Sequence, residues 1–374
     1  MITPPIQVPG VGPYSTKIVF VGEAPGGREV ERGIPFCGPS GKILWEICEE
    51  LKLRRESVYV TNVVKVRCPG DTVKRIKELG LSIEMYLPLL WNEIDAINPN
   101  VILALGNTAL SALTGIINYN DSGIMKYRGS ILPAQGHSYK VVATIHPASL
   151  LERQEDKELH SWKQLQFLRF DINRCIEESK FPEIRYRRRQ LHIAYTAHQL
   201  ELFFRKYEGF SGPCFIDIET FKGLPICIAF AWTPDEGISV PLVNLLKPNG
   251  GQLKISVEEF AGIYQLIANF LADEKIKKAG QNFNFDSTVL GRWGFNVKNF
   301  YADTMLMMHC IYPEMPKSLA FMASIYTNQP YWKDEGREYN PKKDNPDRLL
   351  NYNCLDACVT SEVYEAMMKD LEEL

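Results

Sequence analysis

The sequence predicts two α/β domains in one chain of 374 residues, a length that favours two cores over one. In the first half, short apolar runs alternate with amphipathic helical segments, whereas in the second half three apolar runs come in succession and helical segments follow. Between the halves, "KFPEIRYRRRQ" at 180–190 interrupts the pattern with a proline and clustered arginines. We therefore expect domains at 1–180 and 191–374, joined by a linker at 181–190.

The first half has the pattern of a largely parallel sheet covered by helices. Apolar runs predict strands at 17–22, 58–64, 101–106 and 139–147. Helices are expected at 41–51, at 82–97 with a start or an interruption near Pro88, and at 161–175. Because helices separate the strands, the strands are expected to run mostly parallel.

The second half predicts a separate core in which strands at 214–220, 226–232 and 237–243 precede the helices. Asp217 and Glu219 lie two residues apart on the first of these strands, so their side chains project from the same face. Two adjacent carboxylates are costly to bury without a cation, and hard oxygen ligands favour magnesium or manganese.

Composition limits the possible settings. The formal net charge is -3, which leaves a basic groove on one face possible. No apolar run reaches the ~20 residues of a membrane-spanning helix, and no signal peptide opens the chain, so we expect a cytoplasmic protein without a membrane partner. The nine cysteines are scattered without a CxxC pair and are expected to be reduced.

A glycine-rich loop follows the first predicted strand. The segment "FVGEAPGGREVERGIPFCGPSGKIL" at 20–44 contains six glycines. Loops at the carboxyl ends of parallel strands usually bind ligands, and glycine lets main-chain amides approach a ligand closely. Taken alone, this richness is equally compatible with a tight turn.

Four motifs in order resemble those of family 4 uracil-DNA glycosylases: "GEAPGGREVERGIPFCGPSGKIL", "VYVTNVVKVRCP", "NPNVILALGNTAL" and "TIHPASLL". The resemblance implies a three-layer α/β/α fold and cleavage of the deoxyuridine N-glycosidic bond in uracil-containing DNA, after the base is flipped out of the helix. It also implies that the loop after "HPAS" wedges into the duplex through Leu150 or Leu151.

The resemblance assigns roles to seven residues of this half. Glu23 matches the acid that positions or activates the attacking water, and Glu29 matches a second acid of the same loop. His146 matches the histidine that hydrogen-bonds the departing uracil oxygen. The implied substrate-binding residues are Gly22, Ala24, the stacking aromatic Phe36 and the base-reading amide Asn62.

One feature departs from that family. Its typical members carry four cysteines that hold an iron-sulfur cluster, two of them before the first strand, but the first 17 residues here contain none. Cys68 is the one plausible survivor, and Tyr86 lies about where a later ligand is expected. We therefore expect no cluster and predict that packing stabilises these loops.

The second half resembles the proofreading exonuclease domain of family A DNA polymerases, the tyrosine-containing type with four acids. "CFIDIET", "GQNFNFDSTVLGRWG" and "YNCLDACVT" carry the likeness. It implies a ribonuclease H-like fold and a 3′→5′ exonuclease with two Mg²⁺ or Mn²⁺ ions. The implied metal ligands are Asp217, Glu219, Asp286 and Asp356, and Tyr352 would orient the attacking water.

Together the resemblances predict a DNA-processing replication protein that acts on uracil-containing DNA and on single-stranded 3′ ends. Its expected partner is a DNA polymerase domain in the same or a separate chain, in a bacterial or viral replication complex in the host cytoplasm. Two alternatives remain open. The first domain could be a non-catalytic module that binds DNA or a partner, or the nuclease could trim RNA in the manner of ribonuclease D.

Overall fold

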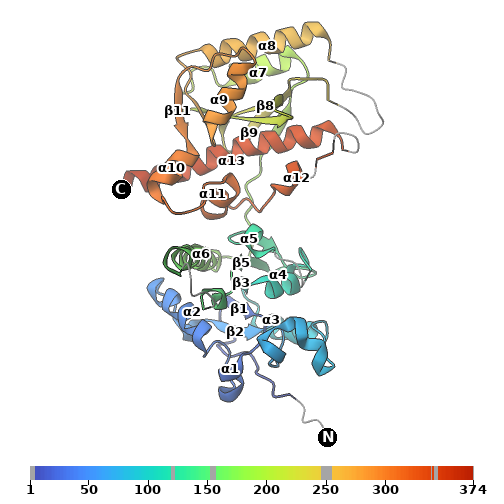
Figure 1. Cartoon of the computed structure of the whole chain (residues 1–374), viewed down its shortest axis with the longest axis vertical. Helices are drawn as coiled ribbons and strands as arrows, with labels where there is room; N and C mark the ends of the chain where they lie inside the picture. The colour runs from blue at the N-terminus through green and yellow to red at the C-terminus, as the bar shows by residue number, and fades with distance from the viewer. Residues whose placement is uncertain are drawn as a thin grey trace. The chain divides into compact units, whose positions relative to one another are not determined.

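The computed structural model describes residues 5–118, 123–151, 157–245, 255–337, 339–340 and 344–373. It divides into two compact units, Met1–Arg185 and Tyr186–Leu374. Both are mixed α/β units, each built around one sheet (Figure 1). None of the helices in the described residues is both long and apolar enough to cross a membrane.

The first sheet has the strand order β2-β1-β3-β5-β4. β1, β2, β3 and β5 run parallel, and only the short edge strand β4 is antiparallel to its neighbour. The largely parallel sheet is therefore confirmed, whereas β4 was not predicted. The strands are β1 (Ile18–Gly22), β2 (Tyr59–Asn62), β3 (Val101–Leu105), β4 (Ile131–Pro133) and β5 (Lys140–Thr144).

Helices cover both faces of this sheet (Figure 1). Val19 and Val21 share a core with α3 and α4, whereas Phe20 points to the opposite face and stacks on Trp45 of α2, with 6.0 Å between ring centroids. The α-helices are α1 (Gly27–Arg32), α2 (Pro39–Glu50), α3 (Leu87–Ile97), α4 (Asn107–Thr114), α5 (Ile124–Tyr127) and α6 (Lys157–Glu178). The 3₁₀ turns are η1 (Arg55–Ser57), η2 (Pro69–Asp71), η3 (Val73–Leu79) and η4 (Pro147–Leu150).

Helix α3 is shorter than the predicted segment 82–97, and it begins at Leu87 with Pro88 in its first turn. Proline lacks an N–H group but fits the first turn, where that group has no intrahelical partner. Asn98 ends the helix in the left-handed conformation, with φ of 50°. Pro88 therefore marks a helix start, one of the two outcomes predicted for it.

The second sheet has the order β11-β10-β7-β8-β9-β6. β8 is antiparallel to both of its neighbours, and the outer pairs are parallel. Lys222 and Gly223 both have positive φ and join β7 to β8 in a tight hairpin. The strands are β6 (Gln190–Ile193), β7 (Cys214–Phe221), β8 (Leu224–Thr233), β9 (Glu236–Pro241), β10 (Lys278–Gly280) and β11 (Phe300–Asp303).

The two faces of this sheet carry different helices (Figure 1). Ile216 and Ile218 of β7 point into a core shared with α7, α8 and α9. The alternate residue Phe215 packs on Tyr364 of α13, so that Asp217 and Glu219 face α13 as well. The helices are α7 (Ala197–Lys206), α8 (Val257–Ala272), α9 (Phe283–Arg292), α10 (Thr304–Ile311), α11 (Leu319–Tyr326), α12 (Asp334–Arg337) and α13 (Pro346–Glu373).

Candidate active sites

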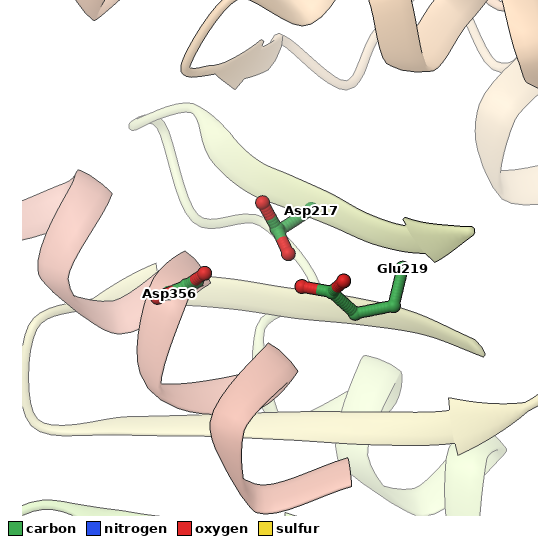
Figure 2. Close-up of side chains that lie close together, drawn as sticks. All are labelled: Asp217, Glu219 and Asp356. Atoms are coloured by element: carbon green, nitrogen blue, oxygen red, sulfur yellow. The ribbon is translucent and has the colours of Figure 1, made fainter. Parts of the chain in front are cut away.

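Three carboxylates converge between β7 and α13 in the second unit. Asp217 and Glu219 come from alternate positions of β7, and Asp356 comes from the buried face of α13 (Figure 2). One oxygen atom of each lies within 4.8 Å of the others. Segments more than 130 residues apart in the sequence therefore supply one acidic site. Clustered carboxylate oxygens in a partly enclosed site fit a hard divalent cation.

Asp286, the fourth predicted metal ligand, lies beside this cluster but does not join it among the described residues. It occupies the first turn of α9, is 6% exposed, and its Oδ1 accepts a hydrogen bond of 3.0 Å from the Ile218 amide. Burial and, after it, the Asp217 charge hold the pKa of Asp286 well above its usual range. Asp286 therefore lies next to the three clustered acids, close enough to Asp217 for the two charges to interact.

Asn353 holds Asp217 in place, a role that the sequence analysis did not predict. Its Nδ2 donates to Asp217 Oδ2 at 2.7 Å and to the Asp217 carbonyl at 3.0 Å. The Asn353 Oδ1 accepts a hydrogen bond from the Ser239 hydroxyl. Asn353 is fully buried, so this chain fixes the orientation of Asp217 before any ligand binds.

Asp356 already has two donors. Trp332 Nε1 donates to Oδ1 at 2.6 Å, and Lys333 Nζ donates to Oδ2 at 2.5 Å. Both donors precede α12, and the sequence analysis missed both. Periodic spacing in the sequence could not predict these contacts, because Trp332 and Lys333 lie in a segment without regular secondary structure. They are 24 and 23 residues before Asp356 in the sequence.

Burial and mutual repulsion shift the site's pKa values. Burial and, after it, the Asp356 charge raise the pKa of Glu219 to about 8, although the Lys333 charge acts in the opposite direction. Burial, Asp356 and Glu219 likewise hold the pKa of Asp217 well above its usual range. Carboxylates that resist ionisation when crowded gain most from a bound cation.

Tyr352 lies one helical turn before Asp356 and is 8% exposed. Burial, followed by the charges of Asp356, Glu219 and Asp217, raises its pKa far above the usual value. The phenol therefore stays protonated at neutral pH and can orient a water molecule but cannot act as a base. The predicted tyrosine thus lies within electrostatic range of all three clustered acids.

In the first unit, Glu23 and His146 line one cavity of about 230 Å³. Ala24 and Cys68 line it too. The carboxylate of Glu23 is held by two donors, the Val73 amide at 3.1 Å and the Thr108 hydroxyl at 2.6 Å. Val73 and Thr108 belong to segments 50 and 85 residues away and were not predicted.

The protonation state of His146 follows from its contacts. Its Nδ1 accepts a hydrogen bond of 3.1 Å from the Ala148 amide, which places the ring proton on Nε2. Burial lowers the pKa of His146, and the Glu23 charge opposes that shift only in part. A neutral imidazole with one N–H donor is therefore the form of this residue at neutral pH.

Gly22, Phe36 and Asn62 come together beside His146. A Cβ added to Gly22 would lie 2.4 Å from Asn62 Oδ1 and 2.5 Å from Phe36 Cζ. The rings of Phe36 and His146 are 5.8 Å apart. Asn62 is 2% exposed, and its Nδ2 has no partner within the described part of the chain. A buried, unsatisfied donor of this kind is rare and favours a ligand acceptor.

Phe36 has a strained backbone, with φ of 53°, that three side chains hold in place. Glu29 Oε1 accepts from the Phe36 amide at 2.5 Å, and Glu29 Oε2 accepts from the Gly26 amide. Trp45 and Arg55 both donate to the Phe36 carbonyl. Burial raises the pKa of Glu29. Glu29, predicted as catalytic, thus contacts the loop backbone and is suited to positioning Phe36.

Cys68 and Tyr86, the two positions discussed for a cluster, belong to one hydrophobic core. They are 2% and 5% exposed, and burial, with a smaller contribution from the nearby Cys68, raises the pKa of Tyr86. Gln7 forms an antiparallel bridge to Val66, which fastens the N-terminal segment onto this core. Cys68 and Tyr86 thus lie in an apolar core, and a backbone bridge ties the N-terminal segment to the segment beside it.

The fold and these two groups of side chains define a chain with two α/β domains, each with its own candidate active site. Residues 9–169 match the uracil DNA glycosylase superfamily, and residues 192–372 match the 3′-5′ exonuclease family of the polymerase A type. The chain belongs to the uracil-DNA glycosylase superfamily through its first unit and carries a polymerase-type 3′-5′ exonuclease domain in its second.

Individual relatives are each similar to about 40% of this chain. The type-4 uracil-DNA glycosylase of Archaeoglobus fulgidus is 39% identical over 153 residues, which cover 40% of this chain and 75% of that protein. The Thermotoga maritima type-4 enzyme is 39% identical over 150 residues, covering 40% of this chain and 74% of the enzyme. A DNA polymerase of Bacillus phage SP01 is 29% identical over 150 residues, 40% of this chain but 15% of the polymerase.

A solved structure of Escherichia coli RNase D is also similar. It has 14% sequence identity and a TM-score of 0.37, and the match covers 49% of this chain and 46% of RNase D.

Proposed function

We propose that the second unit is a metal-dependent 3′→5′ exonuclease that removes nucleotides from single-stranded 3′ ends of DNA. The convergence of Asp217, Glu219 and Asp356 is the observation that carries this proposal. These residues, with Asp286 at the border of the site, would hold two Mg²⁺ or Mn²⁺ ions. When bound, such ions supply charge stabilisation for the attacking and leaving oxygens of a phosphodiester.

The chain's own side chains would orient the reactants. Tyr352 stays protonated, so its hydroxyl can fix the attacking water near the acids. Asn353 keeps Asp217 in one rotamer, which maintains the spacing that the reaction needs.

A labelled-oligonucleotide assay tests this proposal. With magnesium, the protein should shorten a 5′-labelled single-stranded DNA into a ladder, and Asp356→Asn should abolish the ladder. A matched RNA of the same sequence should be shortened at least tenfold more slowly. Faster shortening of RNA would instead identify an RNA-trimming enzyme of the ribonuclease D type.

We propose that the first unit excises uracil from DNA. Asn62 would read the edge of the flipped base with its unpartnered amide, Phe36 would stack on the base, and Gly22 leaves room for both. The neutral His146 would donate from Nε2 to the uracil oxygen on which negative charge develops. Ala24 would line the sugar side of the cavity with Glu23, which would position the attacking water.

An exposed apolar residue next to this site supports DNA insertion. Leu151 follows the η4 turn that His146 caps, and it is 48% exposed. An apolar side chain at that place suits the space that a flipped base leaves in the duplex. Leu151→Ala should weaken excision from duplex DNA more than excision from single-stranded DNA.

Duplex DNA with one deoxyuridine separates catalysis from binding alone. Wild-type protein should convert it to an alkali-labile strand, and Glu23→Gln should not. Tight binding of this DNA by both proteins without base release would identify a non-catalytic reader module.

We further propose that the two domains, with boundaries near 180 and 190, serve a DNA polymerase in the same or a separate chain. The identity to a phage DNA polymerase supports this setting, which would be a bacterial or viral replication complex in the cytoplasm. Co-purification of the chain with the polymerase of its host or virus, from cells expressing both, tests the association.

A further inference from the structure

The segment before and within α12 closes over the acidic site of the second unit. Trp332 and Lys333 each bond to one oxygen of Asp356. Three residues later, a Cβ added to Gly336 would lie 2.5 Å from Tyr352 Cζ, so the α12 backbone packs directly on that ring. Two predicted site residues, Asp356 and Tyr352, are thus covered by one short segment.

Lys333 is enclosed with the acids rather than exposed to solvent. Its side chain is 19% exposed and that of Asp356 is 2% exposed. Its Nζ lies 5.2 Å from the centroid of the Tyr352 ring. An exposed lysine would be screened by water, but an ammonium group in this enclosure interacts with the nearby carboxylates at low effective dielectric.

The position of this ammonium group conflicts with a metal ion. A divalent cation bound by Asp217, Glu219 and Asp356 needs an oxygen of Asp356 at about 2.0–2.6 Å. Both Asp356 oxygens already accept hydrogen bonds, one of them from a cation. Two cations on one carboxylate repel each other strongly in an enclosed site. The ammonium group and the metal ion therefore compete for Asp356.

We propose that Lys333 is a resident cation of the nuclease site, which holds Asp356 in the metal-free protein and must leave it when a divalent metal ion binds. This inference rests on the proposed exonuclease function. Lys333 acts as a positioning residue that keeps the clustered acids together and sets the metal concentration at which the site fills. Trp332 accompanies it as a neutral donor that keeps Asp356 oriented in the absence of metal.

Titration of Mn²⁺ into the full chain, with free Mn²⁺ measured by electron paramagnetic resonance, tests the proposal. Lys333→Met removes the charge and should tighten Mn²⁺ binding by about tenfold or more. Lys333→Arg keeps the charge and should bind Mn²⁺ like the wild type. Lys298→Met removes an exposed lysine elsewhere in this unit and serves as the matched control. Asp217→Ala should abolish the site and gives the background.

The metal-free melting temperature supplies a second readout. In a chelator, Lys333→Met should melt at a lower temperature than Lys298→Met, because the acids lose their internal counter-charge. Saturating Mn²⁺ should remove this difference. A merely structural lysine would lower the melting temperature equally with and without the metal ion.

The outcomes separate this inference from the proposed function. If the wild type binds Mn²⁺ and Lys333→Met binds it equally or more weakly, the resident-cation role is wrong and the exonuclease proposal stands. If the wild type binds no more Mn²⁺ than Asp217→Ala, the exonuclease proposal fails. If Lys333→Met does not fold, Lys333→Gln takes its place under the same criterion, since glutamine keeps a donor but no charge.

Discussion

Replacing Gly22 with alanine is predicted to slow uracil excision by about a hundredfold without unfolding the first unit. The added Cβ would lie 2.4 Å from Asn62 Oδ1 and 2.5 Å from Phe36 Cζ. Ordinary contacts between heavy atoms begin at ~3.5 Å, so both side chains must move by about 1 Å. A displacement of about 1 Å from the productive geometry costs roughly a hundredfold in rate.

Single-turnover excision from a duplex with one deoxyuridine measures this effect, with alkaline cleavage as the readout. Gly38→Ala is the matched control, because Gly38 lies in the same β1–α2 connection, directly before α2, and an added Cβ there meets no atom within 4 Å. Circular dichroism melting should show both variants folded. Wild-type rates for folded Gly22→Ala would refute the assignment of Phe36 and Asn62 to the base site.

Three further predictions concern charge and protonation. Asp217→Asn should lower 3′ shortening of DNA by about a thousandfold, since bound metal ions contribute several kcal/mol, while uracil excision stays unchanged. Because burial and the Asp356 charge raise the pKa of Glu219 to about 8, Mn²⁺ binding should weaken as the pH falls below 8 and Glu219 becomes protonated. The folded metal-free protein binds the Glu219 proton more tightly than the unfolded chain does. The folded protein should therefore lose stability as the pH rises from 4.5 through 8. Calorimetric titrations and melts at several pH values measure both. Burial lowers the pKa of His146, so its ring stays neutral between pH 8 and pH 6.5. A pH–rate profile should therefore show no loss of excision rate from His146 in this range. Protonation of His146 at lower pH should destabilise the first unit.

The sequence was informative where local geometry decides the outcome. The alternation of side chains along β7 places Asp217 and Glu219 on one face of that strand, and helical spacing places Tyr352 and Asp356 on one face of α13. Each pair could therefore be predicted from the sequence, whereas the contact between the two faces required the structure. Buried apolar runs likewise predicted the central strands, since burial on both faces requires continuous apolar sequence.

The remaining features depend on tertiary contacts that spacing does not encode. An aromatic residue in the sequence does not predict the positive φ that Phe36 adopts. Hydrogen bonds between its backbone and the side chains of Glu29, Trp45 and Arg55 stabilise this conformation. Lys333 reaches Asp356 from an irregular segment, and a single lysine in a sequence is usually solvated. Short strands such as β4 and β10 have three residues each, too few for a periodic pattern.

The most direct test of two separate activities in this chain uses one substrate, a 5′-labelled duplex with an internal deoxyuridine and a single-stranded 3′ overhang. In EDTA the strand should keep its full length yet break at the deoxyuridine after alkali, because only the nuclease needs metal. In magnesium the overhang should also shorten from its 3′ end. Full-length, alkali-stable DNA under both conditions would contradict the account.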